Sequence, residues 1–119
     1  MERLVVEICH APYGRQNASS GLAIAMAWAS AGKKVLVALH NDGVYSAKKG
    51  ADPVNGVRLP SVEDQIRGII AAGGRVLADL TCMEVRGIVE EMLVDGVEAS
   101  DGSEMVDLAR SEGEGVITF

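Results

Sequence analysis

The sequence predicts a three-layer α/β fold, in which a mostly parallel five-stranded sheet has helices on both faces. Short apolar runs, rich in β-branched residues, occur at residues 4–9, 35–39 and 75–80. Strands that are buried on both faces of a parallel sheet have this continuous apolar pattern. Helical patterns separate the runs, and glycines mark short connections between them. This alternation is typical of parallel sheets with helical crossovers, so we expect residues 1–119 to form a single domain.

The first half of the chain is expected to contain two strands, one long helix and a short helical turn. Asn17 is a good capping residue for the start of the helix, and Gly32 is suited to end it. Lysines after the second strand indicate a short basic helical turn. The expected elements, in order, are a strand at 4–9, a turn at 10–16, a helix at 17–30, a strand at 35–39 and the helical turn at 46–50.

The second half begins with a loop at 51–60 that contains two prolines. Ser61 with Asp64, and Asp101 with Glu104, have the spacing at which a side chain caps the start of a helix. The two predicted helices have apolar faces at Val62, Ile66, Ile69 and Ile70, and at Met105, Leu108 and Ala109. Strands are expected at 75–80, 94–99 and 115–119, with a further helix after the first of these.

The composition argues against several classes of function. A net charge of −6 disfavours nucleic-acid binding, which requires clustered lysine and arginine. No apolar run reaches the roughly 20 residues of a membrane-spanning helix, so no membrane association is expected. The amino-terminal residues do not follow the order of a secretory signal peptide. We therefore expect a cytoplasmic protein whose two cysteines are reduced thiols.

Cys82 is the candidate nucleophile of this sequence. Thr81 and Glu84 have the spacing of a capping box, which would make Cys82 the first residue of a helix that follows a buried strand. Backbone N–H groups at a helix start have no partner within the helix and carry partial positive charge, which favours a thiolate. Arg86 lies one turn further on and is expected to reach back over the cysteine.

Each of these residues also has a structural interpretation. Cys82 could be a small buried apolar side chain, since cysteine is among the most buried residue types. Arg86 could instead form a salt bridge with Glu90, four residues further along the same helix. Thr81 and Glu84 would support the site only by capping the helix.

Other reactive or titratable side chains follow the predicted strands, where ligands bind in parallel α/β sheets. These residues are Cys9, His10, His40, Asp42 and Tyr45. The two histidines could act as general bases or form hydrogen bonds within loops. The spacing of the elements could bring all of these side chains to one edge of the sheet.

Cys9 has two interpretations that the sequence leaves open. It could serve as a resolving thiol for Cys82 if the first and third strands were neighbours, as in the 2-1-3 strand order of doubly wound sheets. It could also be a core residue at the end of a buried strand. Cys9, His10, His40 and Cys82 are metal-binding residue types, but they lack the spacing of a known metal motif, and no metal is expected.

The order of several motifs resembles that of the DsrE/DsrF-like family, including its TusD-type sulfur-relay members. The motifs are Pro12-Tyr13-Gly14, an alanine-rich helix, Asp42-Gly43-Val44-Tyr45, and Cys82-Met83-Glu84-Val85-Arg86-Gly87-Ile88. The resemblance extends over essentially the whole chain. It implies a compact DsrE-like α/β domain, related to the flavodoxins and assembled as a homotrimer or homohexamer.

The same resemblance implies a function in sulfur transfer. In the sulfur-trafficking relatives, a cysteine at the position of Cys82 carries a persulfide. The expected activity is therefore that of a sulfur carrier, a sulfurtransferase by persulfide relay, that accepts sulfane sulfur on Cys82 and passes it to a partner thiol. Arg86 would stabilise the thiolate and the persulfide. The expected partners are sulfur donor and acceptor proteins, and no cofactor is expected.

Two other functions remain open at this stage. A flavodoxin-like sheet could bind a nucleotide or flavin at the first strand–helix turn. That turn contains only Gly14 and lacks the glycine patterns of nucleotide-binding loops, which weakens this interpretation. The chain could also be a non-catalytic structural subunit of an oligomeric complex, with an inert Cys82.

The first helix predicts a subunit contact. Ile24 and Trp28 share one face, whereas Leu22 and Met26 lie about 160–200° away around the helix. One domain core can hardly bury both stripes, and an exposed apolar stripe is typical of an interaction site. We therefore expect a homotrimer or hexamer, unless the loop at 51–60 covers Trp28.

Overall fold

The computed structural model describes residues 3–50, 60–112 and 115–119. It contains a five-stranded sheet with the strand order β4-β3-β2-β1-β5, in which every neighbouring pair is parallel. The strands are β1 (Arg3–Ile8), β2 (Lys34–Leu39), β3 (Arg75–Asp79), β4 (Glu98–Ser100) and β5 (Gly115–Thr118). The predicted α/β class and parallel sheet are confirmed.

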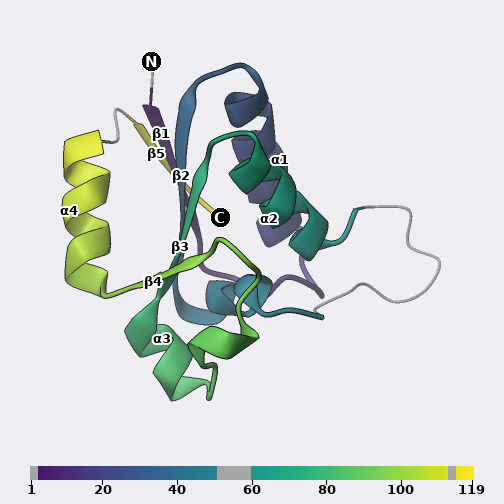
Figure 1. Cartoon of the computed structure of the whole chain (residues 1–119), viewed down its shortest axis with the longest axis vertical. Coiled ribbons are helices and arrows are strands. Elements are labelled where there is room, and N and C mark those ends of the chain that lie inside the picture. Colours follow the sequence, from purple (N-terminus) through teal and green to yellow (C-terminus); the bar gives the residue numbers. More distant parts are fainter. Residues whose placement is uncertain (1–2, 51–59, 113–114) are drawn as a thin grey trace.

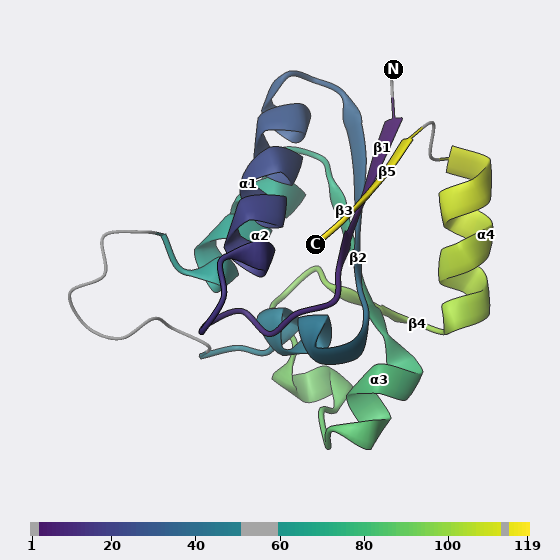
Figure 2. The same cartoon turned by 180° about the vertical axis from the view of Figure 1, so that it is seen from behind.

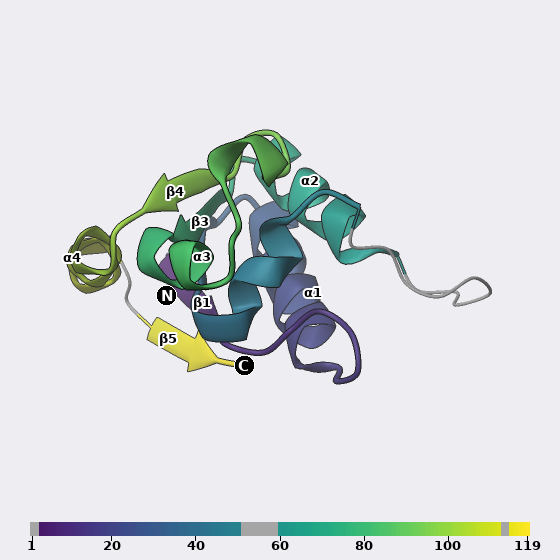
Figure 3. The same ribbon diagram turned by 90° about the horizontal axis from the view of Figure 1, so that it is seen from below.

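The helices lie in layers on either side of this sheet (Figures 1 and 2). On one face lie α1 (Asn17–Ser30) and α2 (Val62–Ala71), and on the opposite face lies α4 (Gly102–Glu112). The short helix α3 (Leu80–Val85) lies instead at the carboxyl edge of the strands (Figure 3). In the described part of the chain, no helix is both long and apolar enough to cross a bilayer.

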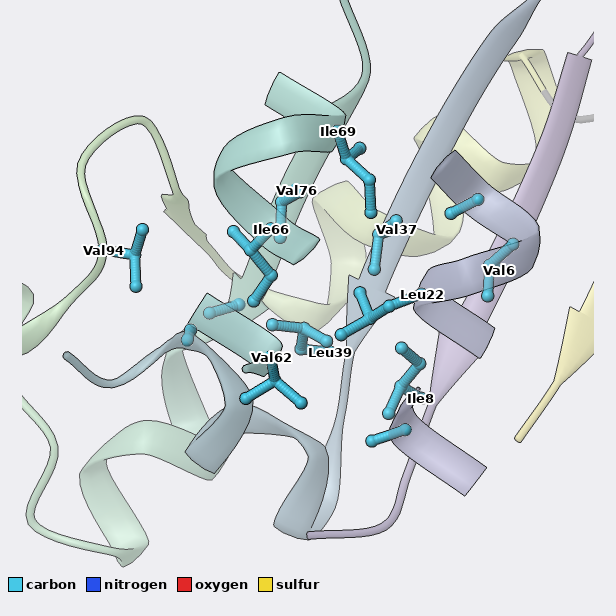
Figure 4. Packing of buried hydrophobic residues seen from close by; sticks show 14 of the residues in the cluster. Val6, Ile8, Leu22, Val37, Leu39, Val62, Ile66, Ile69, Val76 and Val94 are labelled. Carbon is cyan, nitrogen blue, oxygen red and sulfur yellow. The ribbon is translucent and has the colours of Figure 1, made fainter. Parts of the chain in front are cut away.

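The main hydrophobic core lies between the sheet and the α1–α2 layer (Figure 4). Its fully buried side chains include Ile8, Leu22, Leu39, Ile66 and Ile69. A smaller core lies under α4 and consists of Val5, Leu36, Ala38, Leu77 and Met105. Because successive side chains of a strand point to opposite faces, each central strand contributes to both cores, as its continuous apolar sequence requires.

Two of the predicted helix caps are confirmed. The backbone N–H of Asp64 donates to Ser61 Oγ at 3.1 Å, and that of Glu104 donates to Asp101 Oδ1 at 2.8 Å. The predicted cap at Asn17 is wrong, because Asn17 is already helical and Gln16 precedes the helix without a side-chain bond. Of the predicted core of the last helix, Met105 is buried. The side chains of Leu108 and Ala109 lie outside the described residues.

Two further boundaries differ from the prediction. The helical turn predicted at 46–50 is wrong, because the 3-10 segment η1 (Asn41–Ala47) begins directly after β2. Lys48, which follows it, pairs in an isolated bridge with Leu93. The strand predicted at 94–99 is shorter, since the N–H of Val94 donates to Ala47 O at 2.8 Å, outside the sheet. Pairing with β3 begins only at Glu98.

The second stripe of α1 is partly exposed. Ile24 is 38% exposed, whereas Trp28 packs partly against the main core. The ammonium group of Lys33 lies 4.6 Å from the centre of the Trp28 ring, an arrangement typical of a cation–π contact. The suggested cover for Trp28, the loop at 51–60, lies outside the described residues except for its last position.

Candidate functional site

The site lies where β2 and β3 end, at the carboxyl edge of the sheet (Figure 1). From β2 the chain enters η1, and from β3 it enters α3. The two segments are joined across this edge by hydrogen bonds from Asn41 to Cys82 and from Arg86 to Asp42. Because β2 and β3 are neighbours, the residues after these two strands are brought together although they are about forty positions apart.

A close backbone approach fixes the position of η1. The N–H of His40 donates to Ile8 O at 2.9 Å, and the N–H of Gly43 donates to His40 O at 2.8 Å. A Cβ atom at Gly43 would collide with the carbonyl oxygen of Ile8. Glycine is therefore required here for steric reasons. Asn41 adopts a φ of 51°, a left-handed conformation that asparagine tolerates better than most residues.

Asp79, the last residue of β3, caps α3. Its Oδ1 accepts the N–H of Cys82 at 3.3 Å. The predicted capping box of Thr81 and Glu84 is wrong, because the helix begins at Leu80 and both residues lie within it, with exposed side chains. The strand ends one residue earlier than predicted, so the capping position falls on Asp79, which still pairs with Ser100 of β4.

Cys82 lies partly buried at the edge of the main core, with a free thiol. The backbone N–H of Asn41 donates to Cys82 Sγ at 3.2 Å. A thiolate accepts hydrogen bonds more strongly than a thiol, so this N–H is a contact that a charged sulfur can use during a reaction. Asn41 is the first residue of η1, so this N–H lies at the start of that segment.

Arg86 bridges α3 and η1. Its Nε donates to Asp42 Oδ1 at 3.0 Å, and its Nη1 donates to the carbonyl oxygen of Cys82 at 3.1 Å. The guanidinium thus contacts the backbone of Cys82, and its ion-pair partner is Asp42 rather than Glu90. The interpretation of Arg86 as a partner of Glu90 is therefore wrong.

The residues after Arg86 form a Schellman motif that ends α3. The N–H of Gly87 donates to Glu84 O at 3.2 Å, and the N–H of Ile88 donates to Met83 O at 3.0 Å. Gly87 has a φ of 69°, as this motif requires. Ile88 and Met83 are both buried. The Arg-Gly-Ile sequence therefore has a structural role in returning the chain toward the sheet.

His40 is linked to the site through Asp79. Its Nδ1 lies 3.2 Å from Asp79 Oδ2, and the Asp79 residue is 9% exposed. Asp79 thus binds the backbone of Cys82 with one oxygen and the imidazole with the other. His40 is held in place by this contact and lies one residue before Asn41.

Cys9 follows β1. In the sheet, β2 lies between β1 and β3, the strand that precedes Cys82. The predicted condition for a resolving thiol, that the first and third strands are neighbours, is therefore not met. Burial raises the pKa of the Cys9 thiol, and the charges of Glu7 and then Cys82 raise it further. These effects favour the neutral thiol of Cys9.

The turn after β1 lines a cavity of about 300 Å³ that reaches the site at Asp42. The other residues that line it are His10, Ala11, Tyr13, Gly14 and Arg15. His10 Nδ1 is buried and has no hydrogen-bond partner within the described residues. Tyr45, in η1, packs partly buried against the main core. Across the described ranges, no group of three or more metal-binding side chains is positioned to hold an ion.

Asn41 and Asp79 were missed as site residues. Asp79 lies at the end of an apolar run, three residues before Cys82, which is the spacing of an aspartate that caps a helix. Asn41-Asp42-Gly43 is a typical turn sequence. These local signals could have located a cap and a turn. By contrast, nothing in the local sequence around Asn41 or around Cys82 predicts that these two residues contact each other.

A family model described as the DsrE/DsrF-like family matches residues 2–119. An uncharacterised protein of Methanopyrus kandleri is 32% identical over 116 residues, which cover 98% of this chain and 93% of that protein. An uncharacterised protein of Methanocaldococcus jannaschii is 30% identical over 117 residues, which cover 98% and 99% of the two chains. Both similarities therefore extend over the full fold.

Solved structures resemble the whole domain as well. The ychN protein from E. coli superimposes with a TM-score of 0.84 at 25% identity, with both chains fully covered. A protein of unknown function from Methanobacterium thermoautotrophicum, also fully covered, gives a TM-score of 0.74 at 15% identity. The second likeness concerns the fold alone.

Proposed function

Because the chain belongs to the DsrE/DsrF-like family, we propose that it is a sulfur carrier of the TusD-type relay. In this proposal Cys82 accepts sulfane sulfur as a persulfide and transfers it to the thiol of a partner protein. The donor and the acceptor are sulfur-carrying proteins, and the reaction requires no bound cofactor.

One observation supports this function above all others: the N–H of Asn41 donates to Cys82 Sγ. A buried structural cysteine has no need of a donor that points at its sulfur. A nucleophilic cysteine benefits from one, since the attacking species is the thiolate. Cys82 is also only partly buried, so that a sulfur-donating protein can approach its thiol.

The proposed reaction is a pair of sulfur transfers without net oxidation. The Cys82 thiolate attacks the terminal sulfur of a donor persulfide, the bond between the two donor sulfurs breaks, and the donor leaves as a thiolate. Cys82 then holds a persulfide. A partner thiolate attacks its terminal sulfur in the same way, and Cys82 leaves as a thiolate. In each step one S–S bond forms and one breaks.

In this mechanism Arg86 is a positioning residue. Its ion pair with Asp42 ties η1 to α3, and these two segments carry the hydrogen-bond donor and the sulfur. Asp79 fixes the Cys82 backbone and orients His40 at the same edge. In the described part of the chain, no hydrogen bond joins Thr81, Glu84 or Tyr45 to the Cys82 thiol, and we assign these residues no chemical role.

The test is the intact mass of the protein after incubation with inorganic polysulfide. We expect the addition of one sulfur atom, which a reductant removes. The addition should be absent in Cys82→Ser and retained in Cys9→Ser, which serves as the matched control. Sulfur addition at Cys9 alone would refute the assignment of Cys82.

We also propose that the chain assembles with itself. Ile24 is a large apolar side chain that α1 leaves exposed, on the face opposite to the buried Leu22. Contacts between copies would cover it, as expected for an apolar patch on a compact domain. A homotrimer or a hexamer of stacked trimers is the assembly that we propose.

A further inference from the structure

An exposed surface of mixed acidic and apolar character begins beside Cys82. It is formed by α3 and by the segment that follows it, at the carboxyl edge of the sheet (Figure 3). We call it the acidic–apolar surface, and its residues are Glu84, Val85, Val89, Glu90, Glu91 and Met92. All six are exposed.

The apolar members of this surface are unusually open to solvent. Val85 is 76% exposed, Val89 is 50% exposed and Met92 is 37% exposed. Three large apolar side chains within eight positions of one exposed segment have no covering partner in the described part of the chain. Such a concentration is typical of an interaction site rather than of scattered surface residues.

The surface is close to Cys82 for reasons of backbone geometry. Val85 lies three residues after Cys82 in α3, so the two side chains are neighbours on the helix. The hydrogen bond from Ile88 N–H to Met83 O folds the chain back at the end of α3, and Val89 is the next residue. The N–H of Lys49 donates to Met92 O at 2.8 Å, which holds the far end of the surface to the segment after η1.

The charge of the surface indicates the kind of partner. Glu84, Glu90 and Glu91 form no ion pair with any other residue of the described part. The nearest basic residues are already engaged, since Arg86 pairs with Asp42 and Lys49 Nζ lies 3.7 Å from Asp95 Oδ1. Lys48 borders the surface, since it pairs through its backbone with Leu93, and its side chain forms no ion pair within the described residues.

We propose that the acidic–apolar surface docks a partner protein whose cysteine is surrounded by lysine or arginine and by an apolar side chain. This inference rests on the proposed function, because it places the partner's thiol at Cys82. Complementary charge accelerates encounter and selects the partner, and the three apolar side chains provide contact area. A second copy of this chain fits poorly, because it has a net charge of −6 and the same three glutamates.

The test uses two synthetic peptides of equal length, each with one cysteine blocked as an activated disulfide with a coloured leaving thiol. In one peptide the cysteine is flanked by lysines and leucine, and in the other by glutamates and leucine. The Cys82 thiolate of the Cys9→Ser protein attacks the peptide sulfur, and the coloured thiolate leaves. We expect the lysine peptide to react about tenfold faster at low salt, with the difference diminishing at high salt.

Variants then locate the effect. Glu90→Gln/Glu91→Gln should reduce the difference between the peptides to about threefold, and Val85→Ser/Val89→Ser should slow both peptides by about threefold. Asp107→Asn on α4 and Val116→Ser on β5 are matched controls, because both residues are exposed and belong to elements other than α3 and the segment after it. Equal rates for the two peptides, or equal effects of the control variants, would overturn the proposal.

Failure of the docking proposal is distinguishable from failure of the proposed function. A small neutral activated disulfide should react equally with all variants, since it measures the thiol alone. If polysulfide adds no sulfur but the lysine peptide is still preferred, the surface docks a cationic partner for another reaction and the persulfide function is refuted. If Val85→Ser/Val89→Ser dissociates an assembly of the wild type in sedimentation, a second copy covers the surface and the docking proposal is overturned.

Discussion

At the scale of single residues, the site depends on which atoms contact the Cys82 side chain and which contact its backbone. Sulfur receives a hydrogen bond from the N–H of Asn41, whereas Arg86 and Asp79 bind the carbonyl oxygen and the N–H of Cys82. Arg86 therefore affects the Cys82 thiol indirectly, because it holds the backbone of Cys82 in place. One prediction follows from these contacts, and the next ones concern Cys9.

Removal of either partner of the Asp42–Arg86 ion pair should slow sulfur loading. Asp42→Asn and Arg86→Gln each release η1 from α3, and a partly exposed pair of this kind is worth up to about 1 kcal/mol, or roughly fivefold in rate. The double variant should be no slower than either single variant, because both remove the same contact. The measurement is the initial rate of mass increase with polysulfide.

The control for these Asp42 and Arg86 variants is Arg67→Gln. This substitution breaks the Arg67–Glu63 ion pair on α2, away from the site. It should leave the loading rate unchanged. If Asp42→Asn accelerated loading while Arg86→Gln slowed it, the arginine would act by its charge on the thiolate, and the positioning role would be wrong.

Cys9 should titrate above its ordinary pKa of 9.0, chiefly because burial disfavours the thiolate. The alkylation rate of Cys9 in Cys82→Ser, followed against pH, should therefore reach its midpoint at higher pH in the folded protein than in urea. Glu7→Gln should move the midpoint down, since the Glu7 charge raises the pKa.

The same shift has a consequence for stability. The folded protein holds the Cys9 proton more tightly than the unfolded chain, so this contribution is present below the unfolded pKa. It is lost as pH rises through the folded pKa. Urea unfolding at alkaline pH should show a smaller loss of stability in Cys9→Ser. Identical titration of Cys9 in folded and unfolded protein would contradict the assignment.

At the scale of elements, two glycines shape the site for different physical reasons. Gly43 allows η1 to approach the carbonyl oxygen of Ile8, where any Cβ would collide. Gly87 permits a positive φ at the end of α3, and a Cβ there would meet no atom within 4 Å. The first requirement is steric, whereas the second is conformational.

Substitution of these glycines by alanine should therefore have unequal effects on the free energy of unfolding. Gly87→Ala should cost about 1 kcal/mol, the strain of a left-handed conformation in a residue with a Cβ. Gly43→Ala should cost about 3 kcal/mol or more, because backbone atoms must move apart. Urea unfolding measures both, and equal costs would show that η1 moves away without strain.

At the scale of the whole molecule, the two faces of the sheet are covered unequally. Two helices pack on the main core and one helix packs on the smaller core (Figures 1 and 2). Large apolar side chains remain exposed outside both cores, on α1, α4 and β5. They include Ile24, Val106, Val116 and Ile117. The assembly proposed above concerns the first of these.

Light scattering should give the mass of a trimer or a hexamer for the wild type. Ile24→Glu places a charge on the exposed face of α1 and should produce monomers, while Val106→Glu on α4 should leave the mass unchanged. A charged side chain costs little on a solvated surface but much when a subunit contact buries it. A monomeric wild type would refute the assembly, and an intact Ile24→Glu assembly would place the interface elsewhere.

The sequence by itself determined the elements and the class of fold, because apolar period and capping chemistry act over a few residues. The strands around Val6, Val37 and Leu77, and the caps at Ser61 and Asp101, follow from local patterns. The position of Cys82 in the first turn of a helix that follows a buried strand was also predictable. Where a boundary was misjudged, as at Thr81, the competing cap lay only two residues away.

Only the tertiary structure decided which strand ends meet. The order β4-β3-β2-β1-β5 makes β2, not β1, the neighbour of β3. It thereby brings Asn41 and Asp42 to Cys82 and Arg86 and leaves Cys9 one strand away. These contacts join positions more than 40 residues apart. They depend on how crossovers pack against the sheet and on one left-handed backbone residue, and neither leaves a periodic signal in the chain.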